Sequence, residues 1–253
     1  NNLSFSIWKE KRKTMISRDL LSKSFRHWPK FASQARFSSL QIDQSWREKL
    51  RKLDTTSICD AAKNNGLGER VQVLSHQIRP RHQMFKGIKL IGPAFTLCAE
   101  DDFLTVVEAL NMSKEGDVLV INTRESIKAV AGEIFVTEAH RRKLGGIICE
   151  GSVRDSSNLH EIGFPVYSRF LNPYAGTFHV LDSLNEPTQV GGCIVCPGDL
   201  MFGDDDGVLN MGNKAEEIDF LMEQAGLIKE REIAIMKKMK EDNLSLSRIL
   251  NET

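Results

Sequence analysis

Two short polar segments contain the residue types best suited to chemistry. The first is Gly132-Glu133-Ile134-Phe135, which opens a run of helical periodicity, and the second is the turn at Arg154-Asp155. A helix that begins at Gly132 presents unpaired backbone N–H groups and the positive end of its dipole, which suit a carboxylate or phosphate. The strand expected between the two segments returns the chain toward the same side of a sheet. We therefore expect Arg154 and Asp155 to lie beside the helix start.

The two turn residues have complementary chemistry. The guanidinium of Arg154 is a planar fork of donors that matches a carboxylate. The carboxylate of Asp155 is a hard oxygen ligand of the kind that Mg²⁺ and Mn²⁺ prefer. Together they could hold an α-keto acid. An adjacent arginine and aspartate in a turn are more often an exposed ion pair, so the dipeptide alone does not establish catalysis.

The elements that must position these residues are predicted by apolar periodicity, which indicates a mixed α/β class after residue 41. Buried strands are expected at residues 88–97, 118–121, 147–149, 166–168, 193–196 and 208–209. Helices are expected near residues 102–112, 133–144, 155–162 and 215–239, after one helix or helix pair between residues 41 and 65. No solenoid or propeller repeat interrupts this pattern. We expect a single domain over residues 41–253 that ends in a C-terminal helix.

The N-terminal segment differs from the rest in composition. Residues 1–39 carry nine Lys or Arg and two acids, and residues 15–40 are rich in Ser and Arg. This composition is typical of a mitochondrial or plastid presequence, and the alternative is a disordered basic arm. We expect residues 1–40 to lie outside the folded domain. The predicted location is mitochondrial, with the cytoplasm as the alternative.

Composition also limits the kinds of partner. The net charge of the whole chain is zero, so the part after the basic segment is acidic, which disfavours nucleic acid. No stretch approaches the roughly 20 consecutive apolar residues of a membrane span. We therefore expect neither nucleic acid nor a membrane as a partner.

Three further motifs favour structural roles. Cys193 and Cys196 have C-x-x-C spacing but lie in a strand-like run without a second pair, so reduced structural thiols are expected. The run Asp204-Asp205-Asp206 lacks the alternate spacing of a calcium loop, so a tight turn between two strands is expected. His140 stands seven residues after Glu133 and is expected at the surface.

Several motifs together resemble one family in their order and spacing. Gly132-Glu133 and Arg154-Asp155 are preceded and followed by four others: Gly92-Pro93-Ala94-Phe95-Thr96, Gly116-Asp117-Val118-Leu119-Val120, Pro197-Gly198-Asp199 and Gly203-Asp204-Asp205-Asp206-Gly207-Val208. The set is similar to the family that contains regulator of ribonuclease activity A and the 4-hydroxy-4-methyl-2-oxoglutarate/4-carboxy-4-hydroxy-2-oxoadipate aldolases. The resemblance covers roughly residues 50–210.

The resemblance implies a fold, an assembly and a site. The fold would be a compact α/β/β fold of the swivelling-domain type, assembled as homotrimers or homohexamers with active sites at subunit interfaces. Asp155 would hold Mg²⁺ or Mn²⁺ and Arg154 would contact the substrate. Backbone amides of the helix start would bind the pyruvyl carboxylate, which assigns substrate binding to Gly132, Glu133, Ile134 and Phe135. Asn158 departs from the pattern, in which an acid usually stands at that position.

The function implied is that of a class II, metal-dependent aldolase, a carbon–carbon lyase. It would cleave 4-hydroxy-4-methyl-2-oxoglutarate or a related 4-hydroxy-2-oxo acid to pyruvate, and the same electron sink would serve oxaloacetate decarboxylation. The base stays open among a metal-bound water, Glu133 and an acid of a neighbouring subunit. The alternative is a non-catalytic regulator that binds a ribonuclease or another protein. Asp155 favours the enzyme, because family members that act only as regulators lack an aspartate after the arginine.

Overall fold

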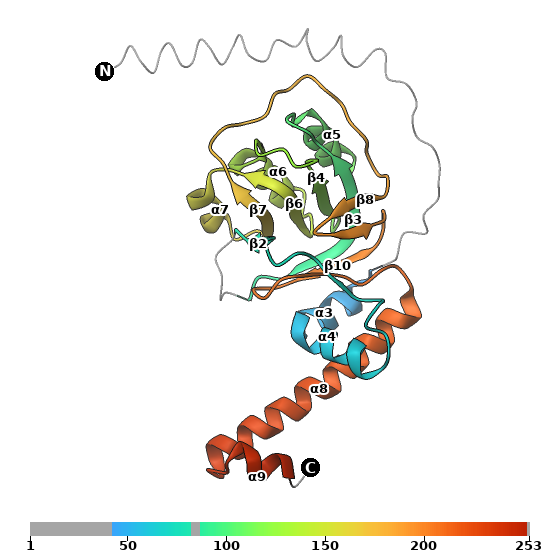
Figure 1. The fold of residues 1–253 in the computed structure, drawn as a ribbon, viewed down its shortest axis with the longest axis vertical. Helices are drawn as coiled ribbons and strands as arrows, with labels where there is room; N and C mark the ends of the chain where they lie inside the picture. The colour runs from blue at the N-terminus through green and yellow to red at the C-terminus, as the bar shows by residue number, and fades with distance from the viewer. Residues whose placement is uncertain (1–41, 82–86, 252–253) are drawn as a thin grey trace, which may run out of the picture. The chain divides into compact units, whose positions relative to one another are not determined.

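The computed structural model describes residues 42–81 and 87–251, and the described residues fall in one compact unit. They form the mixed α/β fold that the periodicity predicts (Figure 1). The helices are α3 (Gln44–Lys52), α4 (Thr55–Asn64), α5 (Leu104–Met112), α6 (Glu133–Arg141), α7 (Ser156–Ile162), α8 (Ala215–Glu241) and α9 (Leu246–Asn251). The strands are β1 (Gln72–Val73), β2 (Arg79–Pro80), β3 (Leu90–Cys98), β4 (Val118–Asn122), β5 (Ala129–Ala131), β6 (Gly146–Val153), β7 (Val166–Leu171), β8 (Thr188–Val190), β9 (Cys193–Val195), β10 (Leu200–Gly203) and β11 (Val208–Asn210).

Four parallel strands form the centre of the main sheet. Strands β3, β4, β6 and β7 are neighbours in that order. Antiparallel strands extend both edges, with β10, β11 and β1 beyond β3 and with β2 beyond β7. Strand β4 pairs with the first half of β6, whereas β5 pairs with Ser152 and Val153 at the end of β6. The chain therefore leaves the sheet after β4 and returns as β5, which pairs with the end of the same neighbour, β6.

Both faces of the parallel strands are buried, which explains their nearly continuous apolar sequences. In β4, Leu119 and Ile121 join a core with residues of α5, α6 and α7, whereas Val118 and Val120 join a second core with residues of β8 and β9. The three layers are therefore helices, main sheet and a small antiparallel sheet. This is the α/β/β arrangement that the resemblance implied.

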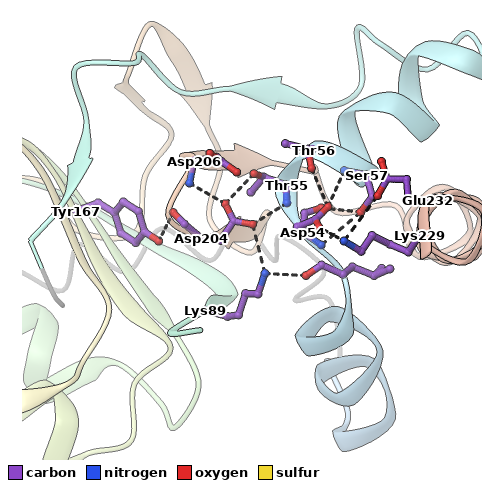
Figure 2. A network of polar contacts seen from close by, with 11 residues as sticks. Asp54, Thr55, Thr56, Ser57, Lys89, Tyr167, Asp204, Asp206, Lys229 and Glu232 are labelled. Carbon is purple, nitrogen blue, oxygen red and sulfur yellow. Dashed lines mark hydrogen bonds and ion pairs between the residues drawn. The ribbon is translucent and has the colours of Figure 1, made fainter. Parts of the chain in front are cut away.

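Helices α3, α4 and α8 form a third core with strands β10 and β11, and a polar network joins it to the sheet (Figure 2). The carboxylate of Asp204, in the turn between β10 and β11, accepts hydrogen bonds of 2.8 Å from the backbone N–H and the hydroxyl of Thr55. Lys89 pairs with the same carboxylate at 3.3 Å, and the Tyr167 hydroxyl donates to the Asp204 carbonyl at 2.8 Å. The acidic run is therefore a turn, as expected, and its first aspartate anchors α4.

Asp54 extends this network to α8. Its carboxylate accepts a 2.8 Å hydrogen bond from the backbone N–H of Ser57, which caps α4, and it pairs with Lys229 of α8 (Figure 2). Burial opposes ionisation of Asp54, but the hydrogen bonds from Lys229 and Ser57 outweigh it and hold the pKa of this carboxyl well below its usual range. A charged aspartate thus adds an ion pair to the apolar contact between α4 and α8.

Most expected elements are confirmed. Every strand and helix expected after residue 41 is present. Elements β1, β2, β5, β8 and α9 were not predicted, and β10 was implied only by the turn expected at residues 204–206. All five cysteines are free thiols, with Cys193 in a strand and Cys196 directly after it, and His140 is exposed as expected. No helix among the described residues has the length and apolar character to span a membrane. The presequence prediction for residues 1–40 lies outside the described residues.

Candidate active site

The two candidate segments meet where β5 and β6 end. Strand β5 leads into Gly132, the N-cap of α6, and β6 leads into Arg154 and Asp155, the latter being the N-cap of α7. The backbone N–H of Arg154 donates to the carbonyl of Ala131 at 3.1 Å, so the two chain segments are bonded directly. The structure therefore brings the two sequence-predicted segments together.

Asp155 caps the neighbouring helix. Its Oδ2 accepts a hydrogen bond of 3.1 Å from the backbone N–H of Glu133, the first residue of α6, and lies 3.6 Å from Nε of Arg154. This contact occupies one of the N–H groups that the sequence had left open for a ligand. Asp155 adopts φ 62° and ψ 37°, in the left-handed region, which aspartate tolerates better than most residues. Side chains of Arg154 and Asp155 are 40% and 38% exposed, so both can meet a solute.

Gly132 is required by close packing against both side chains. A Cβ at this position would lie 2.5 Å from Oδ2 of Asp155 and 2.9 Å from Cγ of Arg154, both too short for real contacts. Its own backbone is extended, so the need is for space and not for an unusual conformation. Any larger residue here would displace the two side chains.

Glu133 and Asn158 form a contact that the sequence did not predict. The side-chain amide of Asn158, in α7, donates to Oε2 of Glu133 at 2.6 Å. Both residues are exposed. Asn158 stands where the family pattern usually has an acid, and in the structure its amide orients the Glu133 carboxylate. The signal available in the sequence was only the separation of Asn158 by one helical turn from Asp155.

Ile134 and Phe135 complete the start of α6. Gly132, the N-cap residue, has no side chain to cap α6, Asp155 takes only the N–H of Glu133, and the intrahelical bonds begin with the N–H of Val136. The N–H groups of Ile134 and Phe135 therefore stay available to an anion. Ile134 is 74% exposed, whereas the ring of Phe135 packs edge-on against Phe103 with centroids 5.6 Å apart. Phe135 thus anchors the helix start and Ile134 faces outward.

The residues present would suit a divalent cation that keeps several water ligands better than a cation bound by protein ligands alone. No group of three or more His, Cys, Asp or Glu suited to a metal occurs in the part of the chain that the structure describes. Asp155 uses Oδ2 for the Glu133 contact, and no hydrogen bond within the described residues engages its Oδ1. Mg²⁺ commonly binds one or two carboxylates and keeps several waters, so one free carboxylate oxygen beside a substrate is a sufficient protein contribution.

A second polar cluster lies beyond the same edge of the sheet and was missed from the sequence. Lys128 contacts Asp101 at 2.7 Å, and Arg124 contacts Asp182 at 2.8 Å and Glu100 at 3.5 Å. Glu100 and Asp101 follow β3, and Arg124 and Lys128 follow β4, whereas Asp182 lies between β7 and β8. The carboxyl ends of β3 and β4 share the edge at which α/β sheets bind ligands. The position of four of these residues after two expected strands was the signal that could have identified them.

Comparison with known proteins gives a family match over most of the folded region. The model of the RraA-like family, described as Aldolase/RraA, matches residues 55–209. A protein of Halalkalibacterium halodurans, whose name provisionally assigns it as a 4-hydroxy-4-methyl-2-oxoglutarate aldolase, is 30% identical over 179 residues. That match covers 70% of this chain and 81% of the relative.

Solved structures share the fold. An uncharacterised protein of Pseudomonas syringae superposes with a TM-score of 0.68 at 22% identity, covering 82% of this chain and 97% of the other. The RNA-processing inhibitor RraA of Thermus thermophilis superposes with a TM-score of 0.54 at 22% identity, covering 60% and 91%. At such identities the likeness establishes the architecture and leaves the chemistry to the site itself.

Proposed function

Because the chain belongs to the RraA-like family, we propose that it is a class II aldolase, a metal-dependent carbon–carbon lyase that releases pyruvate from 4-hydroxy-4-methyl-2-oxoglutarate or a related 4-hydroxy-2-oxo acid. The observation that carries the proposal is the junction of Gly132, Arg154 and Asp155, where a glycine without room for a Cβ abuts an exposed cation and an exposed carboxylate. The name of the Halalkalibacterium relative supports the same reaction.

The substrate would be held by its pyruvyl end. The N–H groups of Ile134 and Phe135 would bind the C1 carboxylate at the positive end of α6, and the guanidinium of Arg154 would face the C2 oxygen. Mg²⁺ or Mn²⁺, bound by Asp155 and waters, would supply Lewis-acid polarisation of the keto acid. Contacts on both sides of the reacting end would orient the C3–C4 bond.

Cleavage then requires one proton transfer and one stabilised charge. A base removes the proton from the C4 hydroxyl, the C3–C4 bond breaks, and its electron pair becomes a pyruvate enolate that is later protonated at C3. Arg154 stabilises the negative charge that grows on the C2 oxygen. Glu133, with one oxygen held by Asn158, is our candidate to accept the hydroxyl proton. The same enolate forms when CO₂ leaves oxaloacetate, so we propose that decarboxylation as a second activity.

We further propose a closed homo-oligomer, a trimer or hexamer, with the site near a subunit interface. Ile127, Leu171 and Tyr174 are 66%, 48% and 69% exposed, and one side-chain and one backbone hydrogen bond join their segments near the site. Asn172 donates to the carbonyl of Ile127, and Ala129 donates to that of Tyr174, both at 2.9 Å. Exposed apolar side chains on adjoining segments support contact with another subunit.

An assay of pyruvate release tests the function. Purified protein is incubated with 4-hydroxy-4-methyl-2-oxoglutarate or oxaloacetate, with Mg²⁺, with Mn²⁺ or with a chelator. The proposal expects metal-dependent pyruvate release that chelation abolishes and added metal restores. Absence of release from both substrates under every metal condition would favour the non-catalytic regulator instead.

A further inference from the structure

The C-terminal helices carry apolar side chains that the described chain leaves about half exposed. In Figure 1 the distal half of α8, together with α9, extends away from the sheet and from helices α3 and α4. Ile233, Met236 and Met239 of α8 are 58%, 47% and 40% exposed. Their spacing of three residues places them on one side of the helix. On α9, Leu246 and Leu250 are also about half exposed. An apolar stripe of this kind indicates a contact surface.

Residues at equal distances on the two sides of Met236 match in apolar character and are opposite in charge. Ile233 and Met239 each stand three residues from Met236, and Glu232 and Lys240 each stand four residues from it. At 3.6 residues per turn, each of these pairs flanks the direction of Met236 at equal angles on opposite sides. Two copies of α8 packed antiparallel across a two-fold axis at Met236 would therefore place Ile233 against Met239 of the other copy, and Glu232 against Lys240. Each contact would occur twice.

We infer that the distal half of α8 is a self-complementary docking surface for a second copy of this chain, with an antiparallel register centred on Met236. The charges favour this occupant over an unrelated partner. Glu232 and Lys240 are both exposed, Glu232 lies 3.8 Å from Lys229 in a weak ion pair, and Lys240 has no ionic partner among the described residues. An isologous contact of this type pairs subunits two by two. If the exposed apolar residues near the candidate site build trimers, this contact between two copies of α8 would join two trimers into a hexamer.

Charge-reversal variants test the register. Glu232→Lys opposes Lys240 with a like charge, and Lys240→Glu opposes Glu232 in the same way. Each single variant should weaken self-association about tenfold, because two symmetry-related attractive pairs become repulsive. The double variant Glu232→Lys/Lys240→Glu should restore association, measured by analytical ultracentrifugation of the full chain. Unchanged association in both single variants, or failure of the double variant to recover it, would overturn the register.

A cross-linking pair gives an independent measurement. A cysteine at the two-fold axis meets its own symmetry mate, so Met236→Cys should form a covalent dimer under mild oxidation. Ala234→Cys is the matched control, since Ala234 is exposed on the opposite side of α8. Wild-type protein, with its three half-buried cysteines, gives the background. Equal dimer yields for the two variants would refute the proposal, whereas a strong excess for Met236→Cys supports it. None of these residues lies in the candidate site, so the outcome is separate from that of the activity assay.

Discussion

Replacement of Asp155 by asparagine should abolish most activity while leaving the fold nearly unchanged. Asparagine tolerates the left-handed backbone of this position, and its Oδ1 can still accept the N–H of Glu133. What is lost is charge. The pair with Arg154 is about 40% exposed and contributes at most about 1 kcal/mol, and the favourable charge at the start of α6 contributes about 0.3–1 kcal/mol. The expected fall in Tm is therefore about 2–4 °C per kcal/mol lost.

The catalytic effect should be much larger than that stability change. Loss of one preorganised electrostatic stabiliser typically lowers kcat at least about a hundredfold, or about 2.7 kcal/mol. Pyruvate release would be followed by coupled NADH oxidation with lactate dehydrogenase, alongside thermal unfolding of the same preparation. Asp219→Asn is the control, because it removes an exposed carboxylate in a comparable ion pair far along the chain on α8. A wild-type rate for Asp155→Asn in the same metal would show that this turn is not the catalytic centre.

Three other predictions follow from the packing and the charges. Gly132→Ala should lower kcat/KM about a hundredfold, because its Cβ would displace Asp155 and Arg154. Gly68→Ala is the control and should be neutral, because a Cβ there meets nothing within 4 Å. Equal kcat/KM values for the two variants would refute the packing argument. The pKa of Asp54 is depressed in the folded state. The contribution of its ionised carboxylate to folding stability is therefore complete above the pKa of aspartate in the unfolded chain, about 3.9, and is lost as the pH falls below that value. Asp54→Asn should therefore flatten the loss of stability between neutral and acidic pH in urea titrations, and the exposed Asp60→Asn should not; identical pH profiles would exclude the role of Asp54. Deletion of residues 1–40 should leave folding and assembly intact by circular dichroism and light scattering, and insoluble protein would show that this segment belongs to the fold.

The sequence predicted those elements whose patterns are strong. Strand β4 is a continuous apolar run, and the period of α8 extends over many turns, so both were located closely. Strands β1 and β2 have two residues each, and β5 contains two alanines, which favour strands weakly. These elements exist because neighbouring strands pair with them, which a local pattern does not contain.

The site was predictable in its location but not in its contacts. The order helix, strand and turn was sufficient to place Arg154 and Asp155 beside Gly132. The hydrogen bonds from Glu133 to Asp155 and from Asn158 to Glu133 join residues 22 and 25 positions apart. They depend on the left-handed backbone of Asp155 and on side-chain rotamers, both of which are set by tertiary packing.

The division of β6 between two partners has a consequence for the evolution of this scaffold. Strand β4 fixes one end of residues 123–128 and β5 fixes the other, and each is hydrogen-bonded to β6 independently. Exchanges at the exposed Arg124 and Glu125 can therefore accumulate without moving Gly132 or Arg154, whereas Thr123 is buried and Ile127 belongs to the proposed subunit contact. Under the proposed function, changes at these two exposed positions would alter which acid is accepted, and a library confined to them would test substrate range while Gly132, Arg154 and Asp155 stay unchanged.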